Sequence, residues 1–304
     1  MASYLLRRIG ETLVTLLLVT LLVFCLTRLT GDPTTLLLGP EASEEARDYF
    51  RHHNNLDRSL VVQYVTYLEH AVAGDFGTSF RLNEPAIKVV FEALGPTLKL
   101  AGLGMLLSIL IGMPLGIWAA ASRSPVIKRI VNWYASLGEA LPPFWSGLTL
   151  VMLFALWLPI FPTSGYGALQ YYALPALTLA ISTSASIAGL AAANVAEALK
   201  SDFIHLERVL GLSQRQILLK HALRNAALPI VTYIGLQFGL ILGGAVVTER
   251  VFAWPGIGQR VVDAILERDY PVVQTVVLVT ALLFMLINLL VDILYMVLDP
   301  RLRA

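Results

Sequence analysis

Six long apolar segments constrain this chain more than any other feature of its sequence. A helix needs roughly 20 apolar residues to cross the hydrocarbon core of a bilayer. Charged residues make up 14% of the chain, well below the share of about 25% in soluble domains. The sequence therefore predicts an all-α membrane protein with six transmembrane helices, at Ile9–Leu29, Thr97–Ala121, Ile130–Leu158, Tyr172–Ala196, Ala227–Thr248 and Val272–Leu298.

Two of these segments have a further feature. The first follows Arg7 and Arg8 and continues to Leu29 without a small-residue cleavage site, so it is too long for the apolar core of a signal peptide and is interpreted as a retained membrane helix. The third contains Pro142 and Pro143. Proline removes a helix hydrogen bond and clashes with the preceding turn, so a kink or an unwound stretch is expected there.

The Lys and Arg residues of the short loops predict the orientation, because cytoplasmic loops are richer in them. With the N-terminus inside, the loop of residues 159–171 is external and carries no charge. Both termini are then expected in the cytoplasm of a multi-pass protein. The inner positions hold Arg7, Arg8, Arg123, Lys128, Arg129, Lys200, Arg208, Arg215, Lys220, Arg224, Arg301 and Arg303.

The segment between the first two spans has a different composition. Residues 30–95 contain ten acidic and five basic side chains together with periodic apolar patches. This pattern predicts a small helical extracytoplasmic subdomain, with a poorly ordered loop as the alternative. The expected division of the chain is therefore residues 1–29, residues 30–95 and a five-helix core of residues 96–304.

No sequence motif for ATP hydrolysis or metal catalysis occurs. The chain lacks G-x-x-x-x-G-K-[ST], H-E-x-x-H and G-x-S-x-G, so no catalytic residue is assigned. His52 and His53 are adjacent, but two neighbouring histidines without a third ligand are more typical of solvated surface, and no metal site is assigned. The net charge of +1 gives no sign of a nucleic-acid partner.

Glu139 is the one ionisable residue placed well inside a predicted span. Intramembrane charges are functional candidates, and Glu139 with Pro142 and Pro143 forms the candidate pathway. The alternative is a carboxylate bonded to a neighbouring helix or to backbone amides freed at the break. Ion-coupled carriers usually pair broken helices in two repeated halves, whereas this chain has one break. A pathway driven by a partner is favoured over an ion-coupled secondary carrier or a membrane scaffold without transport.

A basic stretch, residues 197–225, interrupts the apolar pattern. Gly211 divides it, and Ser213 followed by Gln216 is a capping-box arrangement that predicts a helix beginning near Gln214. Lys220 and Arg224 share a basic face. Two short helices joined at this turn are expected along the cytoplasmic surface. They would either lie at the lipid headgroups or dock a cytoplasmic subunit.

The residues of this stretch resemble a known family. EALKSDFIHLERVLGLSQRQILLKHALRNAALPIVT is similar to the cytoplasmic coupling loop of ABC importer inner-membrane permeases, in particular the B-type subunits of the peptide and nickel group. Four other stretches agree with that group: TGDPTTLLLGP, GDFGTSF, VFAWPGIGQRVVDAILERDYPVVQ and NLLVDILYMVLDPRLR.

The resemblance implies the type I ABC importer permease architecture in a bacterial inner membrane. The chain would be a non-catalytic subunit that forms a heterodimeric pathway for di- and oligopeptides with a second homologous permease. Two cytoplasmic subunits would bind ATP and Mg²⁺, this chain binding no cofactor, and an extracytoplasmic binding protein would deliver the solute. Import of glutathione or of nickel and other metal–chelator complexes is the alternative.

The resemblance also implies a set of ATPase-coupling residues. Where the family has Glu-Ala-Ala before the loop glycine, this chain has His205-Leu206-Glu207, which is expected to alter the contact with the ATPase. The coupling residues carried over are Glu197, Ser201, Asp202, His205, Glu207, Arg208, Gly211, Leu212, Ser213, Lys220, His221, Arg224 and Asn225.

Overall fold

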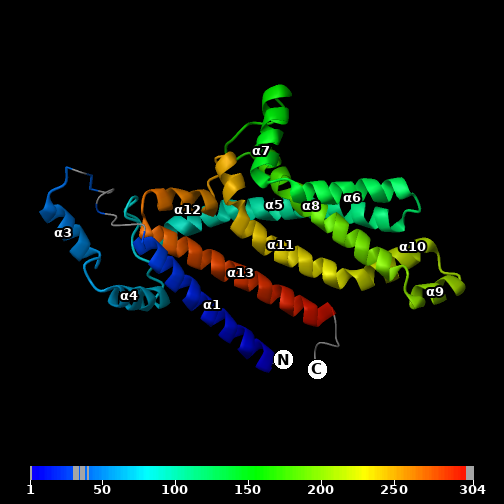
Figure 1. Cartoon of the computed structure of the whole chain (residues 1–304), viewed down its shortest axis with the longest axis horizontal. Coiled ribbons are helices and arrows are strands. Elements are labelled where there is room, and N and C mark those ends of the chain that lie inside the picture. The colour runs from blue at the N-terminus through cyan, green and yellow to red at the C-terminus, as the bar shows by residue number, and fades with distance from the viewer. Residues whose placement is uncertain (1, 30–33, 35–37, 40, 299–304) are drawn as a thin grey trace. The chain divides into compact units, whose positions relative to one another are not determined.

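The computed structural model describes residues 2–29, 34, 38–39 and 41–298, and these are almost entirely helical. Figure 1 shows the course of the chain. By packing, the chain falls into two compact units, Met1–Thr97 with Pro255–Met285 and Leu98–Trp254 with Leu286–Ala304. The three-part functional division expected from the sequence stays a prediction. The expected motif at Gly31-Asp32-Pro33 and the basic residues Arg301 and Arg303 lie outside the described residues.

The expected membrane helices are confirmed. Five helices are long and apolar enough to cross a membrane, and a bent pair makes a sixth when counted as one span. They are α1 (Ala2–Leu29), α5 (Ala86–Ala121), α8 (Gln170–Ala198), α11 (Leu223–Val251) and α13 (Tyr270–Leu298), with α6 (Pro125–Ala140), α7 (Pro143–Val151) and the π-helix η1 (Met152–Trp157) forming the bent pair.

Two helix boundaries differ from the sequence expectation. Helix α5 begins at Ala86 rather than at Thr97 and runs through Gly95 and Pro96, because its first turns bury an apolar face in the core of the first unit. The break after Ala140 is larger than a simple kink, since α6 and α7 are bent by 102°. Leu141 and Pro142 both have extended backbone there, as a residue before a proline prefers.

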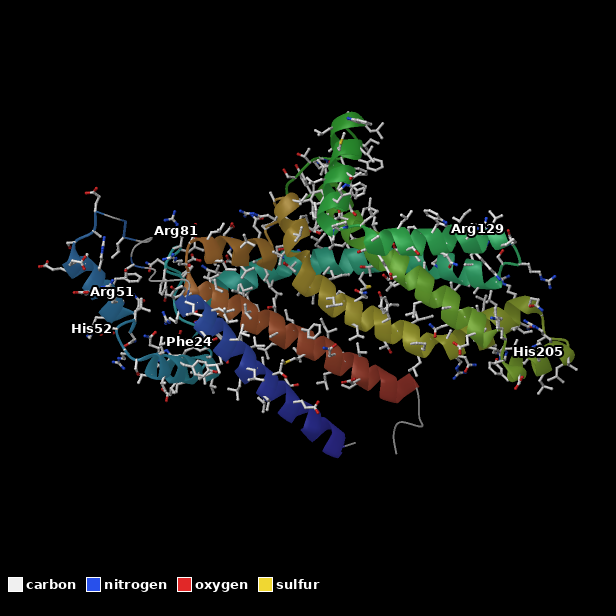
Figure 2. The ribbon with its side chains drawn as sticks, in the orientation of Figure 1. Phe24, Arg51, His52, Arg81, Arg129 and His205 are labelled. Carbon is white, nitrogen blue, oxygen red and sulfur yellow. The ribbon has the colours of Figure 1, made fainter. Side chains whose placement is uncertain are left out.

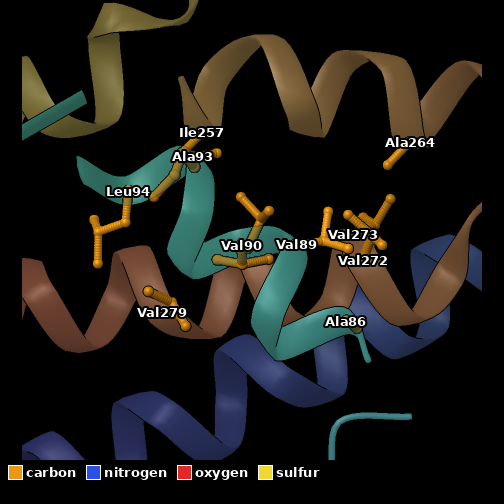
Figure 3. Packing of buried hydrophobic residues seen from close by; sticks show 11 residues of the cluster. Ala86, Val89, Val90, Ala93, Leu94, Ile257, Ala264, Val272, Val273 and Val279 are labelled. Atoms are coloured by element: carbon orange, nitrogen blue, oxygen red, sulfur yellow. The ribbon is translucent and has the colours of Figure 1, made fainter. Parts of the chain in front are cut away.

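The first unit contains the short helices α3 (Glu44–His53), α4 (Leu60–Val72) and α12 (Ile257–Leu266), besides parts of the long ones. Helices α3 and α4 confirm that the segment of residues 30–95 is helical in part. The first turns of α5 pack with α12 and α13 around small and β-branched side chains, as Figure 3 shows. Thr97 ties α12 to this core by accepting a hydrogen bond from the backbone N–H of Ile257 at 2.8 Å.

Asp269 fixes a loop of the first unit. Its carboxylate is 2% exposed. It accepts hydrogen bonds from the Ser79 hydroxyl at 2.5 Å and from the backbone N–H groups of Phe80 and Arg81 at 3.1 and 3.4 Å. Buried carboxylates are tolerated when donors surround them. This contact joins the stretches GDFGTSF and ERDYP, which are 190 residues apart.

In the second unit, α8 is the central helix. Gly112 and Gly116 of α5 and Gly138 of α6 face its backbone and its alanines so closely that a Cβ on any of the three would collide with α8. Small residues allow membrane helices to approach in this way. A hydrogen bond of 2.6 Å between the hydroxyls of Tyr134 and Ser184 joins α6 to α8.

Candidate functional site

The basic stretch of residues 197–225 begins in the last turn of α8. The chain leaves α8, forms helix α9 (Asp202–Val209) and turns at Gly211, which has a φ of +84°. Only glycine adopts this left-handed conformation without strain. After the turn come α10 (Gln214–Gln216), the π-helix η2 (Ile217–Ala222) and α11. Figure 1 shows α9 and α10 at the end of α8 and α11.

The second arm of the stretch differs from the prediction of two short separate helices. Gln214–Gly243 qualifies as one membrane-crossing helix, so α10 and η2 are the beginning of the fifth span. No glycine or proline separates Gln216 from Leu223, and nothing therefore ends the helix between them. Only α9 is a short helix of its own, and the turn at Gly211 connects it to a long helix.

The predicted capping box is confirmed. The Ser213 hydroxyl accepts a hydrogen bond from the Gln216 N–H at 3.3 Å, and the Gln216 side chain accepts one from the Ser213 N–H at 3.2 Å. The two arms then pack on a small apolar core of Ile204, Ile217 and Ala222, each 0% exposed. The geometry of the turn is thus set by its cap and by this core together.

Glu207 and His221 add a contact that the sequence did not reveal. The Glu207 Oε1 lies 2.7 Å from His221 Nδ1, and the two side chains are 17% and 29% exposed. Glu207 Oε2 is buried without a hydrogen-bond partner among the described residues. Both residues were selected as coupling residues, but their pairing across 14 positions follows from the fold of the two arms and not from a helical repeat.

The exposed apolar surface of α9 was also not predicted from the sequence. Phe203 and Leu206 of α9 and Leu210 at its C-cap share one side and are 39%, 60% and 68% exposed, while Ile204 is buried and Glu207 is largely covered. The i, i+3, i+7 spacing could have revealed it, but the charges drew the interpretation to the basic residues. Figure 2 labels His205 on this helix.

The remaining predicted coupling residues are mostly exposed. Asn225 donates a hydrogen bond to the backbone oxygen of His221 at 3.3 Å, and the Arg208 guanidinium donates one to that of Leu199 at 3.5 Å. Ser201 and Leu212 are half-buried, and the exposed members are Glu197, Asp202, His205, Arg208, Gly211, Ser213, Lys220, Arg224 and Asn225.

The candidate pathway residues lie at the break between α6 and α7. Glu139 stands in the last turn of α6 and is exposed, as are Pro142 and Pro143. Neither a neighbouring helix nor freed backbone amides bind the Glu139 carboxylate in the described part of the chain. Glu139 and the coupling residues belong to separate regions of the second unit, and the structure does not bring them together.

The two adjacent histidines have other partners. His52 Nδ1 lies 2.8 Å from a carboxylate oxygen of Asp57, and this hydrogen bond lowers the pKa of the Asp57 carboxyl. His53 stacks on Tyr49 with ring centroids 5.8 Å apart. Among the described residues, no group of three or more His, Cys, Asp or Glu is placed to hold a metal ion.

Two family models together match nearly the whole chain. Residues 112–304 match "Binding-protein-dependent transport system inner membrane component" and residues 1–101 match the N-terminal model of the same components. The chain belongs to this family. Its members are the permease subunits of ABC importers, so the chain is a membrane permease of that class.

Relatives of this permease match it over its whole length. "Glutathione transport system permease protein GsiC" of Salmonella choleraesuis (strain SC-B67) is 40% identical over 304 residues, which is 100% of this chain and 99% of the relative. The protein of the same name from Escherichia coli (strain K12) is 39% identical with the same coverage.

Solved structures of ABC transporters share the permease fold. A chain from "Inward facing conformations of the MetNI methionine ABC transporter: CY5 native crystal form" has a TM-score of 0.58 at 18% identity, covering 69% of this permease and 96% of that chain. "Crystal structure of an amino acid ABC transporter with histidines" gives a TM-score of 0.56 at 16% identity, covering 68% and 93%. These likenesses support the predicted type I permease architecture.

Proposed function

We propose that this permease imports short peptides as one of two related membrane subunits, and that glutathione, itself a tripeptide, is the first solute to test. The glutathione permeases at 39–40% identity support this choice. Metal–chelator complexes remain the alternative solute within the same architecture. The proposed division is a first helix in residues 1–29, an extracytoplasmic subdomain in residues 30–95 and a permease core in residues 96–304.

The proposed orientation has both termini in the cytoplasm of a bacterium. The basic residues Lys200, Arg208, Lys220 and Arg224 near α9 support it, because such residues favour the cytoplasmic side. A binding protein would then deliver the solute on the opposite side. The chain itself would bind no nucleotide and carry out no chemistry, since it has no phosphate-binding loop, and ATP with Mg²⁺ would bind to partner subunits.

The exposed apolar side of α9 supports the proposal that an ATPase subunit docks on this helix. A helix that presents Phe203, Leu206 and Leu210 to solvent outside the spans leaves apolar area that a partner groove would cover. The opposite side of α9 is already packed through Ile204. A docked ATPase would hold α9 by this apolar side, with the predicted coupling residues around it.

The break after α6 supports a pathway role for Glu139, Pro142 and Pro143. Interrupted helices within membranes are tolerated where they are buried in protein or line a water-filled cavity. The Glu139 carboxylate at the end of α6 would meet the cationic group of a passing solute. Glu139→Ala is expected to lower uptake more than assembly.

The test of this function is co-purification and uptake. The tagged chain, expressed with its operon partners, is expected to bring down an ATPase and a second permease, and to support ATP-dependent uptake of labelled glutathione or a dipeptide. Absence of both partners and of uptake would contradict the proposal. Uptake of a nickel chelate but of neither peptide would move the chain to the alternative solute class.

A matched pair of substitutions tests the docking surface. Leu206→Glu is expected to abolish ATPase co-purification while the permease still inserts. Leu60→Glu is the control, because Leu60 in α4 is equally exposed, at 58% against 60% for Leu206. An equal loss of ATPase co-purification in the two variants, or no loss in either, would contradict docking through α9.

A further inference from the structure

The circumference of α6 divides into three sectors. At 3.6 residues per turn, Val131, Tyr134 and Gly138 share the side that packs on α8. A second, apolar sector is formed by Val126, Ile130, Trp133 and Leu137, which are 58%, 60%, 63% and 51% exposed. The third is the polar sector, which consists of Lys128, Arg129, Asn132, Ser136 and Glu139, all exposed.

The polar sector cannot face lipid as the apolar sector can. In the described part of the chain, none of its five side chains makes a hydrogen bond or an ion pair. Charged residues at the centre of a membrane cost about 2.5–3.5 kcal/mol by insertion scales, and they normally face a cavity or a partner. Lys128 and Arg129 lie in the first two turns and can reach the membrane surface, but Ser136 and Glu139 lie much deeper along the helix.

The structure has space along this sector. An open hollow of about 660 Å³ runs along α6 and is lined by residues of this helix alone: Pro125, Lys128, Arg129, Asn132, Trp133, Ser136 and Leu137. Figure 2 shows Arg129 on α6. Four of the five polar-sector residues line the hollow, whereas Glu139, Val126 and Ile130 do not. Water or a solute therefore has room beside the polar side chains.

We propose that the polar sector of α6 is the water-facing wall of the solute pathway and that it recognises a zwitterion. The proposal rests on the importer function proposed above. The basic residues Lys128 and Arg129 lie at one end and Glu139 at the other, about 15 Å apart at 1.5 Å per residue. An extended tripeptide spans roughly 10 Å. The long Arg129 side chain can reach across much of the remaining distance between the two charged ends. A carboxylate and an ammonium group therefore meet opposite charges along one helix face.

The sequence makes the test simple, because Cys25 is its only cysteine. Cys25→Ala gives a cysteine-free parent, into which Asn132→Cys and Ser136→Cys place thiols in the polar sector. Val126→Cys and Ile130→Cys are matched controls in the apolar sector of the same helix, since neither residue lines the hollow. The assembled transporter in membrane vesicles is treated with water-soluble, charged methanethiosulfonates. Since the thiolate is the reactive form, reaction reports contact with water.

The two polar-sector thiols are expected to react at least ten times faster than the two controls. Their preferences for reagent charge should also be opposite. Asn132→Cys lies one turn from Lys128 and Arg129 and should favour the anionic reagent, while Ser136→Cys lies three residues from Glu139 and should favour the cationic one. Adding Glu139→Gln should remove the cation preference at position 136.

Equally slow reaction at all four positions, with uptake intact in the parent, would overturn the proposal, because a partner subunit would then cover the polar sector. Equally fast reaction at the controls would overturn it as well. A fast reaction without opposite charge preferences would refute zwitterion recognition. A parent assembled with its partners that shows no ATP-dependent uptake would instead contradict the importer function, and that outcome is distinct from all of these.

Discussion

Asp269 in the first unit and Glu207 in the second each join segments that are distant in the chain, but the two carboxylates are held differently. Asp269 is 2% exposed and accepts from three donors. Glu207 has a single partner, His221, and an oxygen that none of the described residues binds. The first contact fixes a loop, and the second can exchange its partner.

The largest effect is expected from Asp269→Ala. It leaves the Ser79 hydroxyl and two backbone N–H groups without their acceptor, and such a loss of buried, charge-assisted hydrogen bonds costs about 3 kcal/mol or more. Thermal unfolding of the purified protein in detergent should show a clear drop in Tm. Asp269→Asn is the control and should lose less, because it keeps one acceptor oxygen. Equal Tm values for wild type and Asp269→Ala would remove the contrast with Glu207.

Ser79→Ala should lower the free energy of unfolding by about 1 kcal/mol, a smaller loss than that of Asp269→Ala, in the same thermal unfolding measurement. The hydrogen bonds that the Ser79 hydroxyl makes with Asp269 and Leu82 are removed, but Asp269 keeps its two backbone donors. Ser79 also accepts a hydrogen bond from the Leu82 N–H at 3.0 Å, so Ser79→Thr, which keeps the hydroxyl, should restore stability. A Ser79→Ala loss as large as that of Asp269→Ala would show that the hydroxyl, and not the carboxylate, organises the loop.

Glu207→Ala should lower stability by less than about 1 kcal/mol, since the pair is partly exposed. Its effect should appear in function, as a lower solute-stimulated ATPase rate of the assembled transporter. Glu45→Ala, on an exposed acid of α3 outside the coupling residues, is the control. A double-mutant cycle with His221→Ala should give a coupling energy of similar size. Additive effects would mean that the pair does not hold the two arms together.

Arg81→Ala should lower the free energy of unfolding least, by less than about 0.5 kcal/mol. Arg81 forms an ion pair with Glu267 at 3.7 Å, with side chains 64% and 45% exposed, and such surface pairs contribute little. Its backbone N–H, which Asp269 binds, is unchanged by the substitution. A Tm shift close to that of Asp269→Ala would show that the ion pair, rather than the buried carboxylate, stabilises the loop.

The spans and the break were predictable because they depend on local sequence. A run of apolar residues must form a helix in lipid, and the pair Pro142-Pro143 must interrupt one. The capping box at Ser213 was predictable for the same reason, since its partner is three residues away. The polar sector of α6 was also within reach, because Asn132, Ser136 and Glu139 recur at helical spacing.

The contacts between distant residues were not predictable. Nothing local to Ser79 points to Asp269, and nothing local to Glu207 selects His221 over Lys220. The π-helix η2 adds to this difficulty, because it changes which residues of the second arm face α9. In one sequence without related sequences beside it, such pairs carry no signal until the fold places them together.

The close approach of glycines to α8 has a mechanical consequence. Helix α8 has 29 residues with a single internal proline, Pro175, near its start. It is about 44 Å long at 1.5 Å per residue, and it ends only a few residues before α9. At Gly138 the α6 backbone packs on α8 with only the Ala185 methyl group between them to absorb displacement. A tilt of α8 imposed at its α9 end is therefore transmitted to α6 with little slack, and the direction in which Asn132 and Ser136 face turns with it.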